Sequence, residues 1–175
     1  MTERANTQGR QENLDRQGVA RSLQTWLDEI LPKTGLKLSY KVTAETAAAA
    51  NANEFENPEI VVVFDGPDKD ALLERGAESL LALEYLAVRS LRLNPQFFDR
   101  VRFDCGDYRA LRVAELKMSA KVAADRVRET RQPFRLNPMA PRERRIVHLA
   151  LKDLPGIRTT SEGVGEERQV VIFPA

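Results

Sequence analysis

"NPMAPRERRIVHLALKDLPGIRTTSEGVGEERQVVIF", residues 137–173, is the stretch that decides the fold of the C-terminal part of the chain. Pro141 presets the start of a helix that continues to about Asp153. The apolar residues of that helix share one arc, which consists of Ile146, Val147, Ala150, Leu151 and Leu154. The residues after Gly156 indicate two strands around a glycine-containing turn, a β-hairpin. The stretch therefore predicts a helix packed on a small antiparallel sheet.

The only histidine of the chain, His148, lies on this helix one turn after an arginine. Arg144, His148 and Lys152 recur at intervals of four residues, so they form one row on a side largely opposite the apolar arc. Arg142 and Arg145 add positive charge nearby. The helical phase therefore favours an exposed cationic row over a histidine buried in the core.

Several kinds of chemistry compete for this histidine. The neighbouring cations would repel a metal ion, and with Cys105 as its single cysteine the chain has no cysteine and histidine cluster for zinc. No G-x-S-x-G or H-E-x-x-H motif supports catalysis, although a nuclease with His148 as general base stays open as an alternative. Phosphate contact fits best, because arginine presents a planar fork to phosphate oxygens and histidine donates a hydrogen bond or stacks on a base. We expect no metal, no cofactor and no catalysis.

The net charge of +1 conceals an asymmetry along the chain. Residues 1–105 carry 13 Lys and Arg against 17 Asp and Glu, a net charge of −4, whereas residues 106–175 carry 14 against 9, a net charge of +5. Charge separation of this kind is informative about partners rather than about the fold. It points to an anionic partner for the C-terminal part, while an arginine-rich solvated helix face is the simpler alternative.

The composition favours a globular protein of the cytoplasm. Of the 175 residues, 42% are hydrophobic, which is enough for a core. No run of 18 apolar residues exists, so we expect no membrane insertion. The single cysteine, Cys105, is typical of a reducing compartment.

The N-terminal part shows an α+β order of elements after a tail at residues 1–15, which lacks apolar periodicity and is expected to be disordered. Trp26 falls on the apolar side of the first helix and is expected in the core. Residues 44–58 are rich in alanine and asparagine and indicate a long connection. The expected elements are a helix from 19 to 31, strands at 36–43 and 59–66, helices at 67–76 and 77–95, and a strand at 99–106.

Residues 107–133 predict a helix of about six or seven turns, at roughly 3.6 residues per turn. Its stronger apolar strip consists of Tyr108, Leu111, Met118 and Val122, and its weaker one of Val113, Leu116 and Val127. Lys117, Lys121 and Arg128 fall on a different side. A helix with two apolar strips is expected to pack against two bodies, and the following "FRL", residues 134–136, is expected to form a short strand.

Residues 137–173 closely resemble the C-terminal domain of the bacterial Jag family (SpoIIIJ-associated proteins, also called KhpB). That domain is named for an arginine and a histidine separated by three residues, and Arg144 and His148 match its signature. The element order of residues 16–105 is similar to that of a type II KH domain (αββααβ), and "LLERGAESLLALEYLAV" at 72–88 resembles the family's "IGKRGETLDALQYLV". The resemblance implies a KH-like domain at 16–105 and an Arg-x-x-x-His domain at 106–175.

The KH motif itself departs from the family pattern. A KH domain grips single-stranded nucleic acid with a Gly-x-x-Gly loop, which lets the backbone of the ligand approach closely. Here the matching residues are Leu73, Glu74, Arg75 and Gly76. The leucine side chain obstructs close approach and the glutamate repels phosphate, so we expect this loop to be degenerate.

The resemblance implies a non-catalytic protein that binds single-stranded nucleic acid, with RNA favoured and single-stranded DNA as the alternative. The residues expected to contact it are Arg144, His148, Arg145, Lys152, Arg142, Lys117 and Lys121. The alternative is a protein-interaction module, in which the KH-like domain has lost RNA binding and pairs with itself or with a small KH-domain protein.

Overall fold

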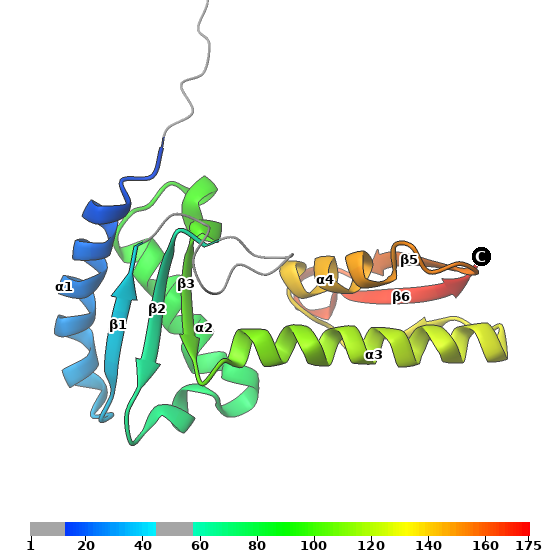
Figure 1. The fold of residues 1–175 in the computed structure, drawn as a ribbon, viewed down its shortest axis with the longest axis horizontal. Coiled ribbons are helices and arrows are strands. Elements are labelled where there is room, and N and C mark those ends of the chain that lie inside the picture. Colours follow the sequence, from blue (N-terminus) through cyan, green and yellow to red (C-terminus); the bar gives the residue numbers. More distant parts are fainter. Residues whose placement is uncertain (1–12, 45–57) are drawn as a thin grey trace, which may run out of the picture. The chain divides into compact units, whose positions relative to one another are not determined.

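The structure is a computed structural model, and it describes residues 13–44 and 58–175. The predicted tail at 1–15 and the predicted connection at 44–58 therefore lie almost wholly outside the described residues. The described chain divides into two compact units with their boundary between Cys105 and Gly106. Each unit has its own helices and its own sheet (Figure 1). The α+β class is confirmed.

The first unit is a three-stranded sheet with the order β1-β2-β3, in which β1 is antiparallel and β3 parallel to the central strand. Ile60, Val62 and Phe64 of β2 are buried and alternate with more exposed residues, as a strand with one covered face requires. Its elements are α1 (Arg16–Thr34), β1 (Ser39–Thr43), β2 (Ile60–Asp65), η1 (Lys69–Leu72), α2 (Glu74–Ser90), η2 (Pro95–Arg100) and β3 (Val101–Cys105).

Helix α1 begins where the side chain of Asp15 accepts the Gly18 N–H at 3.0 Å, and it ends at Gly35 in the left-handed conformation. Its buried residues are Ala20, Leu23, Leu27 and Leu31. Trp26, expected in the core, is only partly buried, because it lies beside this buried stripe rather than within it. The first of the two expected consecutive helices is shorter than predicted and forms the single 3₁₀ turn η1.

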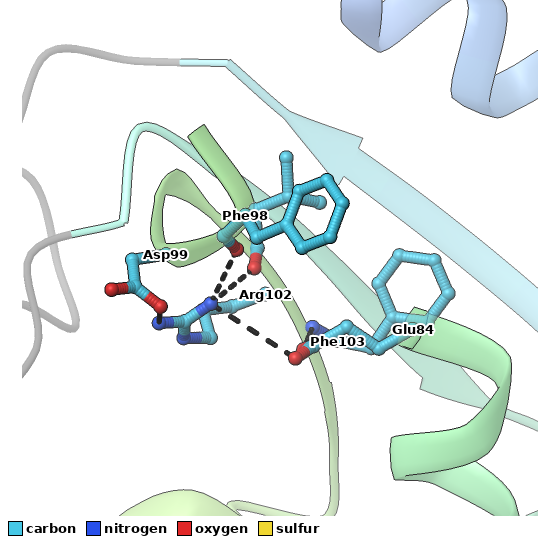
Figure 2. A network of polar contacts seen from close by, with 6 residues as sticks. Glu84, Phe98, Asp99, Arg102 and Phe103 are labelled. Atoms are coloured by element: carbon cyan, nitrogen blue, oxygen red, sulfur yellow. Dashed lines mark hydrogen bonds and ion pairs between the residues drawn. The ribbon is translucent and has the colours of Figure 1, made fainter. Parts of the chain in front are cut away.

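The outer edge of β3 is closed by side chains (Figure 2). The carboxylate of Glu84 accepts the main-chain N–H of Phe103 at 2.7 Å. Arg102, which is only 3% exposed, donates to the carbonyl oxygens of Phe98 and Val101 at 2.9 and 2.6 Å. Its guanidinium lies 3.9 Å from Glu84 and 3.5 Å from Asp99. An edge strand with satisfied N–H groups is a poor template for another strand.

The second unit is an antiparallel sheet with the order β4-β6-β5, against which α3 and α4 pack, as predicted (Figure 1). Val170 and Ile172 of β6 face the helices and are fully buried. Its elements are α3 (Tyr108–Thr130), β4 (Phe134–Arg135), α4 (Pro141–Leu151), β5 (Ile157–Glu162), η3 (Gly165–Glu167) and β6 (Gln169–Pro174). None of the helices in the described residues is long and apolar enough to cross a membrane.

Helix α3 buries the opposite strip from the one that the sequence favours. Leu116 and Val127 of the weaker strip are buried together with the alanines between them, whereas Leu111, Met118 and Val122 are 66%, 70% and 63% exposed. Small alanine side chains allow α3 to approach α4 and the sheet closely, and a count of large apolar residues overlooks them. The larger apolar side chains of this helix are therefore on the surface of the second unit.

Glu143 fixes the start of α4. Its carboxylate accepts the Ala140 N–H at 3.1 Å and forms a 2.6 Å ion pair with Arg112 of α3. In the predicted apolar arc, Ile146, Val147 and Leu151 are buried and Leu154 is partly buried, but Ala150 is exposed. The helix thus turns slightly further from the sheet at this position than its pattern suggests.

Candidate nucleic-acid interface

His148 bridges α4 and β5. Its Nδ1 lies 2.7 Å from the Thr159 hydroxyl and its Nε2 lies 2.9 Å from the Ser161 hydroxyl. A neutral imidazole donates from one nitrogen and accepts at the other, and a hydroxyl serves in either role. Both ring nitrogens are therefore satisfied within the protein. His148 is half-buried, so it is neither the core histidine nor the fully exposed one that the sequence offers as extremes.

The environment of His148 favours the neutral ring. Burial and, after it, the positive charge of Arg144 lower the pKa of His148 below its usual value. The ring is accordingly neutral at pH 7. It supplies hydrogen bonds between α4 and β5 rather than charge.

Arg144 has a different environment one turn earlier on α4. Its Nε is buried and has no hydrogen-bond partner within the described residues. No carboxylate of the described chain lies within ion-pair distance of Arg144, Arg145 or Lys152. Arg145 and Lys152 are exposed. These three cations lack internal compensation and are available to an anion.

Several other cations of the second unit are compensated. Arg112 pairs with Glu143 and Glu115, and Arg135 pairs with Glu162 at 2.6 Å. Arg128, predicted with the lysines on one side of α3, donates to the carbonyl oxygen of Pro155 and pairs with Asp125.

The remaining predicted contact residues lie on two helices. Arg142 lies in the first turn of α4 and Lys117 lies on α3, and both have interaction partners in the structure. Lys121 is exposed on α3, one turn after Lys117. The structure thus brings Arg144, His148 and Lys152 together in one row and places the two lysines on a separate helix.

Thr159 and Ser161 are the residues of this site that sequence reasoning missed. They alternate with residues on the other face of β5 and follow Ile157, which packs against the core of this unit. The period of two from Ile157 onward is a signal that both hydroxyls face the helices. Within the described chain, no three His, Cys, Asp or Glu residues form a group that could hold a metal ion.

The degenerate KH loop has an unusual backbone. Arg75, Gly76 and Ala77 all lie in the left-handed region, with φ of 51°, 73° and 64°. Leu73 is partly buried, whereas Glu74, Arg75 and Gly76 are exposed. Left-handed conformations are costly for residues with a Cβ atom, so this turn is strained at Arg75 and Ala77.

The geometry defines a class of protein in which an α+β unit of KH-like order is followed by an Arg-x-x-x-His unit. Comparison with known families supports the second part, because the family model of the Arg-x-x-x-His domain matches residues 114–174. A curated relative from Bacillus subtilis (strain 168), named RNA-binding protein KhpB, is 33% identical over 151 residues, which cover 83% of this chain and 72% of that protein. The chain belongs to the KhpB (Jag) family, as the resemblance of its motifs implies.

A second relative, RNA-binding protein KhpB of Clostridium symbiosum, is 34% identical over 120 residues, which cover 69% of this chain. The matched part is 54% of that relative, so the chain spans about half of its length. A third, the protein of the same name from Lactiplantibacillus plantarum, is 30% identical over 119 residues, which cover 68% of this chain and 37% of that protein.

Proposed function

We propose that this protein binds single-stranded nucleic acid, RNA in the first place, without catalysing a reaction on it. The observation that carries the proposal is the set of uncompensated cations Arg144, Arg145 and Lys152 on and just after α4. Phosphate contacts supply most of the affinity of sequence-tolerant nucleic-acid binding. The names of the relatives from C. symbiosum and B. subtilis agree with RNA as the ligand.

In this proposal the residues of the row have different tasks. Arg144 offers a planar fork to phosphate oxygens and Lys152 adds a point charge at the end of the helix. His148 is neutral and hydrogen-bonded to β5, so it holds the row in place and leaves its ring face for the ligand. Arg142, Lys117 and Lys121 add positive potential around the row.

Fluorescence anisotropy with a labelled single-stranded RNA tests the proposal. Arg144→Ala and Lys152→Ala should each weaken binding and lower the slope of log affinity against log salt by about one. Arg21→Ala is a matched control, since it removes the same charge from an exposed position of α1. If the Arg144→Ala and Lys152→Ala proteins bind like the control, the assigned surface is wrong. A DNA oligonucleotide of the same sequence measures the preference for RNA.

The absence of catalysis belongs to the same proposal. His148 uses both ring nitrogens for Thr159 and Ser161, which leaves neither nitrogen poised as a general base. RNA incubated with the protein and magnesium should therefore stay intact on a sequencing gel. Cleavage that disappears in His148→Gln would instead support the nuclease.

The second candidate is a protein-interaction module formed by the KH-like unit, with a second copy or a small KH-domain protein as partner. The obstructed and acidic loop at Leu73 and Glu74 favours it, as do the exposed side chains of Tyr85 and Leu86 on α2. Analytical ultracentrifugation of the full chain over a wide concentration range tests self-association. We place the protein in the cytoplasm as part of either proposal, in keeping with the unpaired thiol of Cys105.

A further inference from the structure

A groove runs along α3 on the side of the second unit that carries β4. One wall is the exposed apolar surface of Met118 and Val122, and the other is the segment 134–139, from β4 to the residue before Ala140. The floor is apolar and buried, and it consists of Leu116, Ala123 and Val147. All of these residues belong to one compact unit, so the groove is a feature of that unit alone.

The groove is at the opposite edge of the sheet from the row that contains His148. That row lies over β5, because His148 binds Thr159 and Ser161. The strand order β4-β6-β5 puts β4 at the other edge. With neighbouring strands about 4.8 Å apart, the two outer strands are separated by roughly 10 Å. The groove is therefore distinct from the phosphate row and close enough for one oligonucleotide to reach both.

The polar groups of the groove include a flat cation that has no carboxylate partner. The guanidinium of Arg126 lies over the Phe134 ring, 5.5 Å from its centroid, and no ion pair with it exists among the described residues. The other two arginines of the groove, Arg112 and Arg135, are neutralised by Glu143, Glu115 and Glu162. Asn137 is exposed beside them and has no hydrogen bond within the described chain, so its amide offers both a donor and an acceptor.

These features match a nucleobase. A base has two apolar faces, which stack on apolar or guanidinium surfaces, and a polar edge, which an asparagine amide recognises. Arg126, and Lys121 one turn earlier on α3, provide uncompensated positive charge for the phosphates beside that base. Exposed apolar surface of this size otherwise carries a solvation cost with no return in the free protein.

We infer that the groove between α3 and residues 134–139 binds a base of the single-stranded nucleic acid whose phosphates contact the row on α4. The inference rests on the proposed function and adds a second contact of a different kind, since it depends on the base and not on the phosphate. The two contacts are separable by experiment because they respond differently to salt and to loss of the base.

Methionine methyl groups report on the groove directly. The chain has three methionines, of which Met118 and Met139 line the groove and Met1 does not. In the full chain labelled with ¹³C at the methionine methyls, a single-stranded RNA at saturation should shift the Met118 and Met139 signals and leave Met1 unchanged. An abasic oligonucleotide of the same length should still bind but shift them much less.

Matched variants add an affinity measurement. Met118→Ala and Asn137→Ala should each weaken RNA binding about fivefold or more, as loss of one base contact does, with an unchanged salt slope. Leu111→Ala is the control, because Leu111 is as exposed on the same helix but lies outside the groove, and it should bind like the parent chain. All three changed side chains are exposed, so folding should be retained.

The outcomes separate the two proposals. Methyl signals that stay still at saturation, or that respond equally to the abasic strand, overturn the groove while Arg144→Ala still tests the phosphate row. Methyl shifts caused by an acidic amphipathic peptide and not by RNA would make the groove a protein-docking site and also overturn the inference. A chain that binds no RNA at all overturns both proposals.

Discussion

The imidazole of His148 connects α4 to β5 through two hydroxyl groups, with its Nε2 2.9 Å from Ser161 and its Nδ1 2.7 Å from Thr159. Arg144 lies one helical turn away with its Nε buried and without a partner in the described chain. One residue of the signature thus satisfies its polar groups internally, while the other does not. The signature therefore combines an internal anchor with an outward-directed cation.

The hydroxyls of β5 should contribute to stability through this anchor. Thr159→Val keeps the shape of the side chain and removes the partner of Nδ1, so we expect a loss of about 1–2 kcal/mol in the free energy of unfolding. Urea titration followed by circular dichroism measures it. Thr160→Val is the control, because Thr160 is exposed on the other face of the same strand. Equal stabilities of the two variants would show that the hydroxyl contact has no weight.

The lowered pKa of His148 predicts a pH-dependent stability. Because burial and Arg144 lower the pKa in the folded state, the unfolded chain binds more protons between the two pKa values. Stability should therefore be complete above pH of about 6.5, the ordinary histidine value, and fall as the pH drops through that value toward the folded-state pKa. Urea midpoints at pH 7.5 and 5.5 should differ more for the parent chain than for His148→Gln.

If both proteins lose the same stability over that range, the carboxylates and not His148 account for the change. The histidine that contributes to this window can only be His148, since the chain has one histidine. This makes the single variant a complete control for imidazole titration.

The sequence predicts the elements of the second unit well because their periods are clear. Pro141 marks the start of α4, and the hairpin follows from alternation around glycine. The choice between the two strips of α3 fails because burial depends on fit as well as on side-chain size. Met118 and Val122 are the larger residues, but alanines such as Ala120 and Ala124 let the neighbouring layers approach.

The candidate site could be predicted only in part for a related reason. Helical phase identifies the row of Arg144, His148 and Lys152, since that row depends on one element. The partners of His148 lie on β5, and only the pairing of α4 with that strand decides that Thr159 and Ser161 are within reach. Ion pairs such as Arg112 with Glu143 likewise join residues far apart in the sequence.

Glu84 should be important for the first unit. It accepts the Phe103 N–H and lies beside the buried guanidinium of Arg102, as Figure 2 shows. Glu84→Ala leaves a buried donor and a buried cation with fewer partners, so we expect a loss of about 2–4 kcal/mol. Glu84→Gln keeps an oxygen for the N–H and should lose less. Chemical denaturation of both variants checks the order, and a larger loss in the glutamine variant would contradict this account.

The left-handed turn at residues 75–77 predicts a stabilising substitution. Arg75 is exposed with φ of 51°, so its side chain gains little from burial while its backbone is strained. Arg75→Gly should raise the free energy of unfolding by about 1 kcal/mol, because glycine adopts this conformation without the steric cost. Ala82→Gly on the exposed, regular part of α2 should lower it by about 1 kcal/mol. Urea unfolding of the two variants gives opposite signs if the turn is left-handed in solution, and equal destabilisation would show that Arg75 is helical there.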